Sequence, residues 1–172
     1  MEEGIGTADL DSRSAGSANR EETAIKGTGG SGLLAQIRGT FGGGEVDIRT
    51  YSPLTLAYIG DAVFEIIIRT LIVERGQRAA NTLHKHTTRI VCAQTQAKLI
   101  DAVYGHLTEE EQEIYRRGKN TKLHSTAKNA SLADYRRATG FEALCGYLFL
   151  RDDTERILWL VGQAIEMAQV EL

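Results

Sequence analysis

The stretch "LAYIGDAVFE", residues 56–65, is an apolar run with one carboxylate in its middle, Asp61, and a second carboxylate one helical turn later, Glu65. Burying an unpaired carboxylate is expensive, so a buried acid is paired with a cation, protonated or bound to a metal ion. We therefore ask whether the rest of the sequence contains a cationic partner for Asp61 or indicates that Asp61 binds a metal ion.

The residues around this stretch follow helical spacing. Ser52 can cap a helix that begins at Pro53, and apolar residues recur at helical intervals as far as Arg75. Similar patterns continue along the chain, and no neighbouring segments alternate like paired strands. We therefore predict an all-α fold. Its expected helices cover residues 53–75, residues 81–105, a short segment that opens with a Thr108/Glu111 capping box, the "TGFEALCGYLFL" segment at 139–150, and about 152–171.

The composition of the chain changes near residue 50. Residues 1–50 contain eleven of the eighteen glycines and eight acidic against five basic side chains. Such a segment buries too little apolar surface to offset the entropy lost on ordering it. We therefore predict a flexible glycine-rich tail over residues 1–50, with a short helix or docking segment at 33–41, and one folded domain over 51–172.

Charge and hydropathy limit the class of protein. The formal net charge is -3, so any binding to a polyanion must come from a local patch. No apolar run reaches the roughly 18 residues that a membrane span needs, and the N-terminus lacks the apolar core of a secretory signal. Cys92 and Cys145 lack metal-binding spacing and fit a reducing compartment. We expect a cytoplasmic protein without a membrane segment.

A second carboxylate, Glu142, stands alone in the apolar segment "TGFEALCGYLFL", where glycines permit close helix contact. Two such acids on two helices that pack together suggest a shared site. A pair of oxygen ligands with the remaining positions open to water suits Mg²⁺, with Mn²⁺ as a substitute. The alternative is that each acid caps a neighbouring helix or pairs with an arginine such as Arg69 or Arg137.

The segment between the two acidic motifs is strongly basic. Residues 116–137 carry seven lysines and arginines against one acid, Asp134, and this pattern favours a phosphate-rich polyanion. The alternative is a solvated loop whose charges balance acidic surface elsewhere. The candidate contacts are Arg116, Arg117, Lys119, Lys122, Lys128, Asn129 and Arg136, with Lys85 and Arg89 on the helix at 81–105 as further candidates.

These motifs resemble a known family. "LAYIGDAVFE" resembles the signature helix of ribonuclease III catalytic domains, and "TGFEALCGYLFL" resembles their second acidic motif, in the same order. The likeness covers about residues 51–168. Four details resemble the Mini-ribonuclease III family in particular: Ala57-Tyr58, Gly140-Phe141, "RRGKN" at 116–120 and Lys128-Asn129.

The resemblance implies a compact helical endoribonuclease domain that works as a homodimer on double-stranded RNA with Mg²⁺, leaving a 5′-phosphate and a 3′-hydroxyl. It makes Asp61 the key catalytic acid and Glu142 a metal ligand. It also implies maturation of the ends of the 23S ribosomal RNA precursor, and a ribosomal protein could present this RNA. Without a separate double-stranded RNA-binding domain, affinity would come from the basic surface of the dimer.

The sequence departs from full-length ribonuclease III, which has further acids where this chain has Ala57 and Thr139. A site with two ligands should hold Mg²⁺ more loosely and rely on substrate phosphates for the rest of its coordination. Glu65 is either a third ligand or outer partner, or the ion-pair partner of Arg69. The alternative function is a non-catalytic RNA-binding or scaffold protein in which the thinned acidic set marks lost activity.

Overall fold

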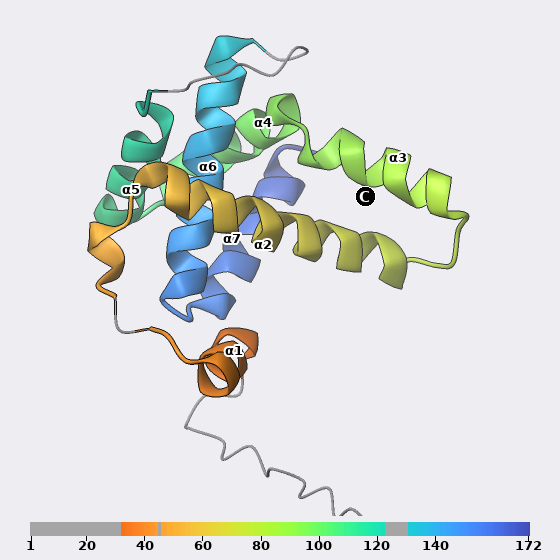
Figure 1. Ribbon diagram of the computed structural model, residues 1–172. Helices are drawn as coiled ribbons and strands as arrows, with labels where there is room; N and C mark the ends of the chain where they lie inside the picture. The colour runs from red at the N-terminus through yellow and green to blue at the C-terminus, as the bar shows by residue number, and fades with distance from the viewer. Residues whose placement is uncertain (1–31, 45, 123–130) are drawn as a thin grey trace, which may run out of the picture.

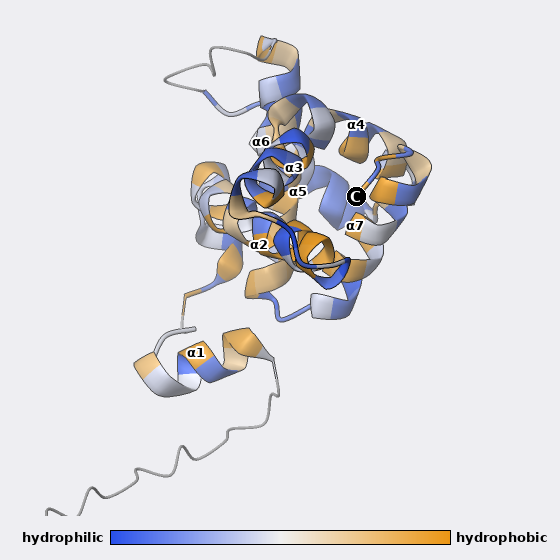
Figure 2. Ribbon diagram, turned by 90° about the vertical axis from the view of Figure 1, so that its right-hand side faces the viewer, coloured by the Kyte–Doolittle hydropathy of each residue, from blue (hydrophilic) through white to orange (hydrophobic). Residues whose placement is uncertain are grey.

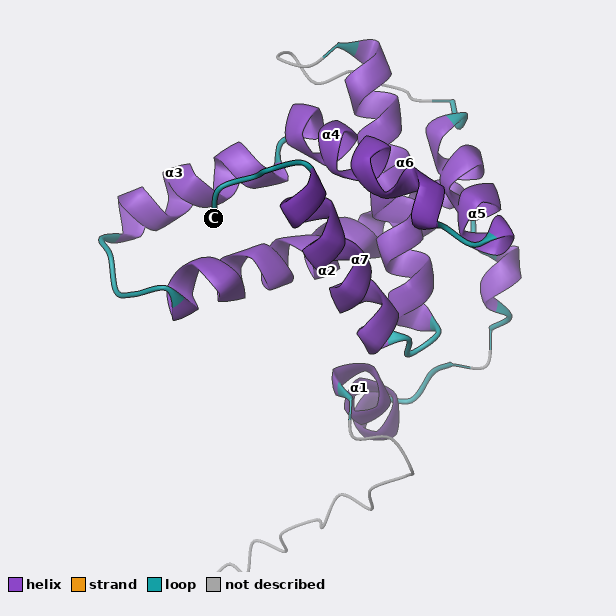
Figure 3. Cartoon of the chain, turned by 180° about the vertical axis from the view of Figure 1, so that it is seen from behind, coloured by secondary structure: helices purple, strands orange, loops and turns teal. Residues whose placement is uncertain are grey.

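The computed structural model describes residues 32–44, 46–122 and 131–172, and every regular element in these ranges is helical (Figures 1 and 3). The predicted all-α fold is confirmed. None of the described helices combines the length and apolar character needed to cross a lipid bilayer. The α-helices are α1 (Leu33–Phe41), α2 (Pro53–Glu74), α3 (Ala80–Val91), α4 (Ala93–Val103), α5 (Glu109–Lys119), α6 (Leu132–Leu150) and α7 (Thr154–Met167), and the 3-10 helices are η1 (Ile48–Thr50) and η2 (Tyr104–His106).

Helix α6 forms the centre of the domain. It is buried from Ala138 to Leu148 apart from Glu142, and it contacts α2, α4, α5 and α7 (Figure 1). Seen from behind, α7 crosses the opposite side of the bundle from α2 (Figure 3). A central helix surrounded by others needs apolar residues on all its faces, which explains the continuous apolar run "FEALCGYLFL". Glu142 is therefore the one acid in the buried part of α6.

Local capping explains where most helices begin. The Ser52 hydroxyl accepts the backbone N–H of Thr55 at the start of α2, and the predicted Thr108/Glu111 capping box opens α5. The side chain of Asp153 caps α7. These starts agree with the predictions, whereas α7 ends at Met167, earlier than the predicted end near residue 171.

The prediction of one helix over residues 81–105 is wrong. The backbone is extended at Cys92, with φ -71° and ψ 155°, and this break separates α3 from α4. Side chains of α4 bind the carbonyls freed at the end of α3: the Thr95 hydroxyl donates to Arg89 O at 2.9 Å, and Gln96 Nε2 donates to Val91 O at 3.0 Å. Apolar spacing continues through the break, so periodicity alone did not reveal it.

Part of the segment predicted as a tail is ordered as helix. Residues 33–41 form α1, as predicted, and its Leu34 is buried while the Arg38 guanidinium donates to Leu150 O at 2.9 Å. Phe41, the last residue of α1, is 82% exposed. Residues 1–31 and 45 lie outside the described part of the chain, so the flexible tail stays a prediction there.

The crossing of α2 and α6 is so close that it leaves no room for side chains. A Cβ at Gly60 would overlap the backbone oxygen of Glu142 and the backbone nitrogen of Gly146, and a Cβ at Gly146 would overlap the backbone oxygen of Leu56. Only glycine fits both positions, because helix backbones cannot rotate out of the way as side chains do. The two helices that carry the acidic motifs thus touch through their backbones.

We predict that Gly60→Ala lowers the free energy of unfolding by more than about 3 kcal/mol, because the added methyl group must push α2 away from α6. Gly162→Ala on α7 is the matched control, since no atom lies within 4 Å of its Cβ position. That substitution should raise the free energy of unfolding by about 0.8–1 kcal/mol through helix propensity alone. Urea unfolding measures both changes, and equal effects would contradict the close crossing.

Candidate active site

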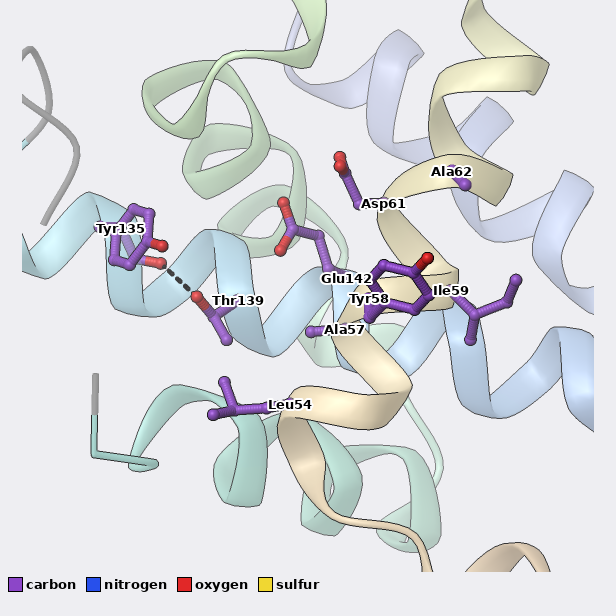
Figure 4. A pocket seen from close by; sticks show the side chains of 9 residues that line it. All are labelled: Leu54, Ala57, Tyr58, Ile59, Asp61, Ala62, Tyr135, Thr139 and Glu142. Atoms are coloured by element: carbon purple, nitrogen blue, oxygen red, sulfur yellow. Dashed lines mark hydrogen bonds between the residues drawn. The ribbon is translucent and has the colours of Figure 1, made fainter. Parts of the chain in front are cut away.

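The close crossing of α2 and α6 brings the two predicted acids together. Asp61 follows Gly60 directly on α2, and Glu142 supplies the α6 backbone oxygen that Gly60 touches. Their carboxylates project from facing helices into the same space (Figure 4). This space is an open pocket of about 420 Å³ lined by Leu54, Ala57, Tyr58, Ile59, Asp61, Ala62, Tyr135, Thr139 and Glu142.

Both carboxyl groups bind their protons more tightly than usual. Burial raises the pKa of Asp61, and the charge of Glu65 raises it further. Burial raises the pKa of Glu142 to about 7, the charge of Asp61 adds to this shift, and a hydrogen bond from the Gln96 side chain opposes it. Two acids with raised pKa values in one pocket are typical of a functional site, because a bound cation would relieve their repulsion.

The arginines that could have neutralised these acids bind elsewhere. Arg69 pairs with Glu65 at 2.8 Å, as one of the two readings of Glu65 predicted. Arg137 pairs with Asp101 and Asp134, each at 2.6 Å. The alternative that these arginines neutralise Asp61 and Glu142 is therefore wrong. Within the described residues, neither acid has a cationic partner.

The donor set of the pocket fits a hard divalent cation such as Mg²⁺. Two carboxylates without a cationic partner among the described residues provide charged oxygen ligands, and the open pocket leaves room for waters and phosphate oxygens. Ala57 and Thr139 also line the pocket, at the places where the resemblance to full-length ribonuclease III would put further acids. The Thr139 hydroxyl donates its proton to Tyr135 O at 2.9 Å, so it is committed to the helix backbone (Figure 4). Asp61 and Glu142 would thus be the main protein ligands.

Helix α5 carries the first part of the basic segment and packs closely on α6. A Cβ at Gly118 would lie 2.8 Å from the Cα of Gly140, so a second glycine contact places α5 beside the helix of the pocket. Three of the predicted cations lie on α5, and each has a contact within the domain: Arg116 pairs with Glu113 at 2.6 Å, Arg117 donates to Tyr51 O at 3.3 Å, and Lys119 lies 5.8 Å from the centre of the Tyr115 ring.

The remaining predicted contacts divide into separate groups. Lys122 and Arg136 are exposed beside the ends of α5 and α6. Lys128 and Asn129 lie outside the described part of the chain. Lys85 and Arg89 are exposed on α3, which lies at the opposite end of α2 from α5 (Figure 1). Within one chain these two cations therefore do not form a continuous basic surface with those of α5.

Two residues of the site escaped the sequence analysis. Tyr135 lines the pocket, but it sits in the basic segment and was not distinguished there from the charged residues around it. Gln96 is only 1% exposed and its side chain lowers the pKa of Glu142, but the continuous helix predicted over residues 81–105 gave it no role. A polar residue at a buried helical position is the signal that could have singled out Gln96.

Comparison with known proteins decides the family. A sequence model described as the Ribonuclease III domain matches residues 54–153, more than half of the chain. A protein of Enterococcus faecalis called Mini-ribonuclease 3 is 46% identical over 122 residues, which cover 70% of this chain and 92% of that protein. This chain belongs to the Mini-ribonuclease III family. Another Mini-ribonuclease 3, from Clostridium tetani, is 48% identical over 112 residues, 64% of this chain and 74% of the relative.

The fold of this Mini-ribonuclease III chain agrees with a solved structure. A crystal structure of a Fusobacterium nucleatum protein superposes with a TM-score of 0.64 at 32% sequence identity, covering 70% of this chain and 96% of the other. The resemblance drawn from the two acidic motifs is therefore confirmed, and the protein is an endoribonuclease of the ribonuclease III class.

The raised pKa of Glu142 predicts a pH-dependent effect of Glu142→Gln on the metal-free protein. Below the ordinary pKa of 4.5 the Glu142 carboxyl is neutral in both the folded and the unfolded state, so no charge is buried on folding. As the pH rises through about 7 the buried carboxyl ionises, and the folded protein loses the stability that the neutral form gave it. With EDTA present, Glu142→Gln should change the free energy of unfolding little at about pH 4 and raise it by about 1–3 kcal/mol at about pH 8.

Urea unfolding of wild type and variant at both pH values measures this difference. Glu74→Gln, an exposed acid at the end of α2, is the matched control and should behave alike at both pH values. If Glu142→Gln shifts stability equally at both pH values, the carboxyl does not carry a raised pKa in the folded protein.

Proposed function

We propose that this Mini-ribonuclease III cleaves double-stranded RNA in a Mg²⁺-dependent reaction that leaves 5′-phosphate and 3′-hydroxyl ends. The observation that carries the proposal is the Asp61–Glu142 pair, two acids that face one pocket without a cationic partner in the described residues. A protein that only bound RNA would gain nothing from carboxylates placed against phosphates, because like charges repel.

Asp61 and Glu142 would hold the metal ion, and Mn²⁺ is expected to substitute for Mg²⁺. When bound, such an ion neutralises charge on a phosphoryl oxygen and lowers the pKa of water. Glu142 must lose its proton to act as a ligand, and with a pKa of about 7 it does so readily once a cation is near. Glu65 raises the pKa of Asp61 but is paired with Arg69, which supports an outer role for it.

The cations beside the pocket support a duplex RNA substrate. Duplex RNA is recognised mainly through phosphates and 2′-hydroxyls, so lysines and arginines on a helical surface suffice for binding. Arg116, Arg117 and Lys119 are held on α5, and Lys122 and Arg136 stand exposed near them. Lys128 and Asn129 extend this proposed RNA contact along the sequence. The α3 pair, Lys85 and Arg89, is a secondary candidate.

An exposed apolar surface on α2 supports a homodimer. Tyr58 is 81% exposed and Ile66 is 57% exposed, and the ribbon of α2 carries the orange of hydrophobic residues over part of its length (Figure 2). Ile66, Ile67 and Leu71 line an apolar hollow of about 210 Å³ together with Leu158 of α7. Apolar surface of this kind typically marks a protein contact. A dimer would present two pockets, one for each RNA strand.

The family resemblance extends the proposal to a biological substrate. We propose that the protein matures the ends of the 23S ribosomal RNA precursor in the cytoplasm, with a ribosomal protein presenting the RNA. What supports this extension is the combined likeness of "LAYIGDAVFE", "RRGKN" and "TGFEALCGYLFL" to Mini-ribonuclease III proteins. The proposed site, two carboxylates open to a phosphate-bound cation, carries no feature that would select one RNA sequence over another.

We predict that the wild type cuts a long RNA duplex in Mg²⁺ and that EDTA abolishes cleavage. Asp61→Asn should lower the cleavage rate by more than the roughly 10–100-fold that loss of an outer partner of a metal ligand costs. Its binding of the duplex should remain, because the cations are unchanged. Single-turnover cleavage and fluorescence anisotropy measure the two quantities, and Glu74→Gln at the far end of the same helix is the control.

Two outcomes would contradict the proposed activity. If the wild type binds duplex RNA but does not cut it with any divalent ion, the protein is an RNA-binding scaffold. If Asp61→Asn cuts as fast as the wild type, the chemistry lies elsewhere.

Glu65→Gln distinguishes the two roles of Glu65. A loss of cleavage rate as large as that of Asp61→Asn would identify Glu65 as a metal ligand. We expect a smaller loss, because Glu65 is paired with Arg69.

A second prediction concerns the RNA contacts. Replacing Lys122 and Arg136 together by glutamine should reduce the slope of log affinity against log salt concentration by about 2 per subunit, since each lost phosphate contact contributes nearly 0.9. Replacing Lys85 and Arg89 in the same way should reduce it by less than about 1, because α3 lies far from α5. Anisotropy titrations in EDTA over a range of salt concentrations measure both slopes, and an equal reduction would place α3 in the RNA contact.

A further inference from the structure

Tyr135 lines the pocket of the acidic pair without serving the apolar core. It lies on α6 and faces the same pocket as Asp61 and Glu142 (Figure 4). Its side chain is half-buried. Among the described residues, it belongs neither to the buried core nor to the partly buried apolar side chains that pack against that core. Packing alone therefore gives no reason for a tyrosine at this position.

The hydroxyl of Tyr135 is also unused by the fold. The backbone oxygen of this residue accepts the Thr139 hydroxyl, but the phenol forms no hydrogen bond with any described residue. The buried Tyr147 behaves differently, since its hydroxyl donates to Glu110. A phenol that lines an open pocket and has no partner in the protein can bind a group that enters the pocket.

The position of Tyr135 on α6 determines which part of a substrate it would meet. Tyr135, Thr139 and Glu142 follow one another along the pocket face of α6 (Figure 4). Tyr135 and Glu142 are two helical turns apart, about 10 Å along the helix axis at 1.5 Å per residue. Both side chains tilt toward the start of the helix, so the tilt does not bring them together. A strand whose scissile phosphate lies at the acidic pair would thus present a neighbouring nucleotide to Tyr135.

The charges around the pocket favour a neutral partner for this hydroxyl. A divalent cation would balance the two carboxylates, and the scissile phosphate would then leave the pocket with a net negative charge. A second phosphate beside Tyr135 would be repelled, because a phenol has no positive charge to attract it. The exposed cations Lys122 and Arg136 are better suited to the flanking phosphates. A 2′-hydroxyl is neutral and, like a phenol, both donates and accepts hydrogen bonds.

We propose that the Tyr135 hydroxyl binds a 2′-hydroxyl of the strand that is cut, on a nucleotide beside the scissile phosphate. Contacts to phosphates are the same in RNA and DNA, whereas the 2′-hydroxyl distinguishes them. Tyr135 therefore makes the site selective for ribose. The other phenol of the pocket, Tyr58, is 81% exposed on α2, a helix that carries none of the candidate RNA cations. This proposal rests on the proposed function of the pocket.

Tyr135→Phe tests the proposal, because it removes the hydroxyl and keeps the ring. Tyr104→Phe is the matched control, since Tyr104 is 37% exposed, packs its ring on Tyr115 and does not line the pocket. Single-turnover cleavage is measured with the enzyme in excess of the RNA but below its Kd. On an all-RNA duplex we expect Tyr135→Phe to cut about 3–10-fold more slowly than the wild type, as the loss of one neutral hydrogen bond implies.

Substrates with single 2′-deoxynucleotides around the mapped cut identify the partner of the hydroxyl. At one flanking position the deoxy substitution should slow the wild type and Tyr104→Phe by about 3–10-fold. It should leave Tyr135→Phe unchanged, because that variant has already lost the same bond. Mn²⁺ binding to the RNA-free protein, measured by electron paramagnetic resonance, should be alike in all three proteins.

The contrary results are distinct from one another. The proposal is overturned if Tyr135→Phe cuts the all-RNA duplex as fast as the wild type. It is also overturned if every deoxy substitution slows Tyr135→Phe as much as the wild type, since the hydroxyl would then bind another part of the RNA. Loss of Mn²⁺ binding by Tyr135→Phe would assign the residue to the metal instead. If the wild type itself neither binds Mn²⁺ nor cuts RNA, the proposed function fails and this proposal fails with it.

Discussion

The close crossing of α2 and α6 is the constraint on which the rest of the structure depends. Gly60 and Gly146 let the two helix backbones touch, and the position after Gly60 is Asp61. A larger residue at either glycine would separate the helices and, with them, the two carboxylates. Glu142 supplies both a backbone oxygen at the crossing and a side chain in the pocket. The distance between the two backbones that carry the acidic pair is therefore set by direct backbone contact.

The cost of this arrangement is electrostatic. Desolvation and the charge of Asp61 raise the pKa of Glu142 to about 7, and the neighbouring arginines are occupied by other acids. An apolar pair in the same place would stabilise the fold, since unpaired charges in a partly buried site oppose folding. The domain nevertheless keeps two like charges in one pocket, as the proposed cation-binding site would require.

Two further contacts connect this pair to the remainder of the domain. Gly118 lies against Gly140 and brings the basic helix α5 alongside α6, so cations stand near the acids without neutralising them. On the other side, the buried Gln96 side chain closes the α3–α4 junction by donating to Val91 O, and it lowers the pKa of Glu142. The proposed RNA-binding surface, the proposed metal ligands and the helix junction thus meet along one helix, α6, which is also the centre of the apolar core.

Much of this protein follows from its sequence alone. Helical periodicity and the Ser52 and Thr108 caps predicted the all-α fold, and the isolated acids in "LAYIGDAVFE" and "TGFEALCGYLFL" predicted the candidate pair Asp61 and Glu142. The resemblance of these two motifs to ribonuclease III proteins predicted the family. Those features are local, so a single chain segment carries them. Only the tertiary structure decided four other features, because each depends on which helices pack together. These are the break at Cys92, the buried amide of Gln96, the pairing of Arg69 and Arg137 with other acids, and the separation of α3 from α5.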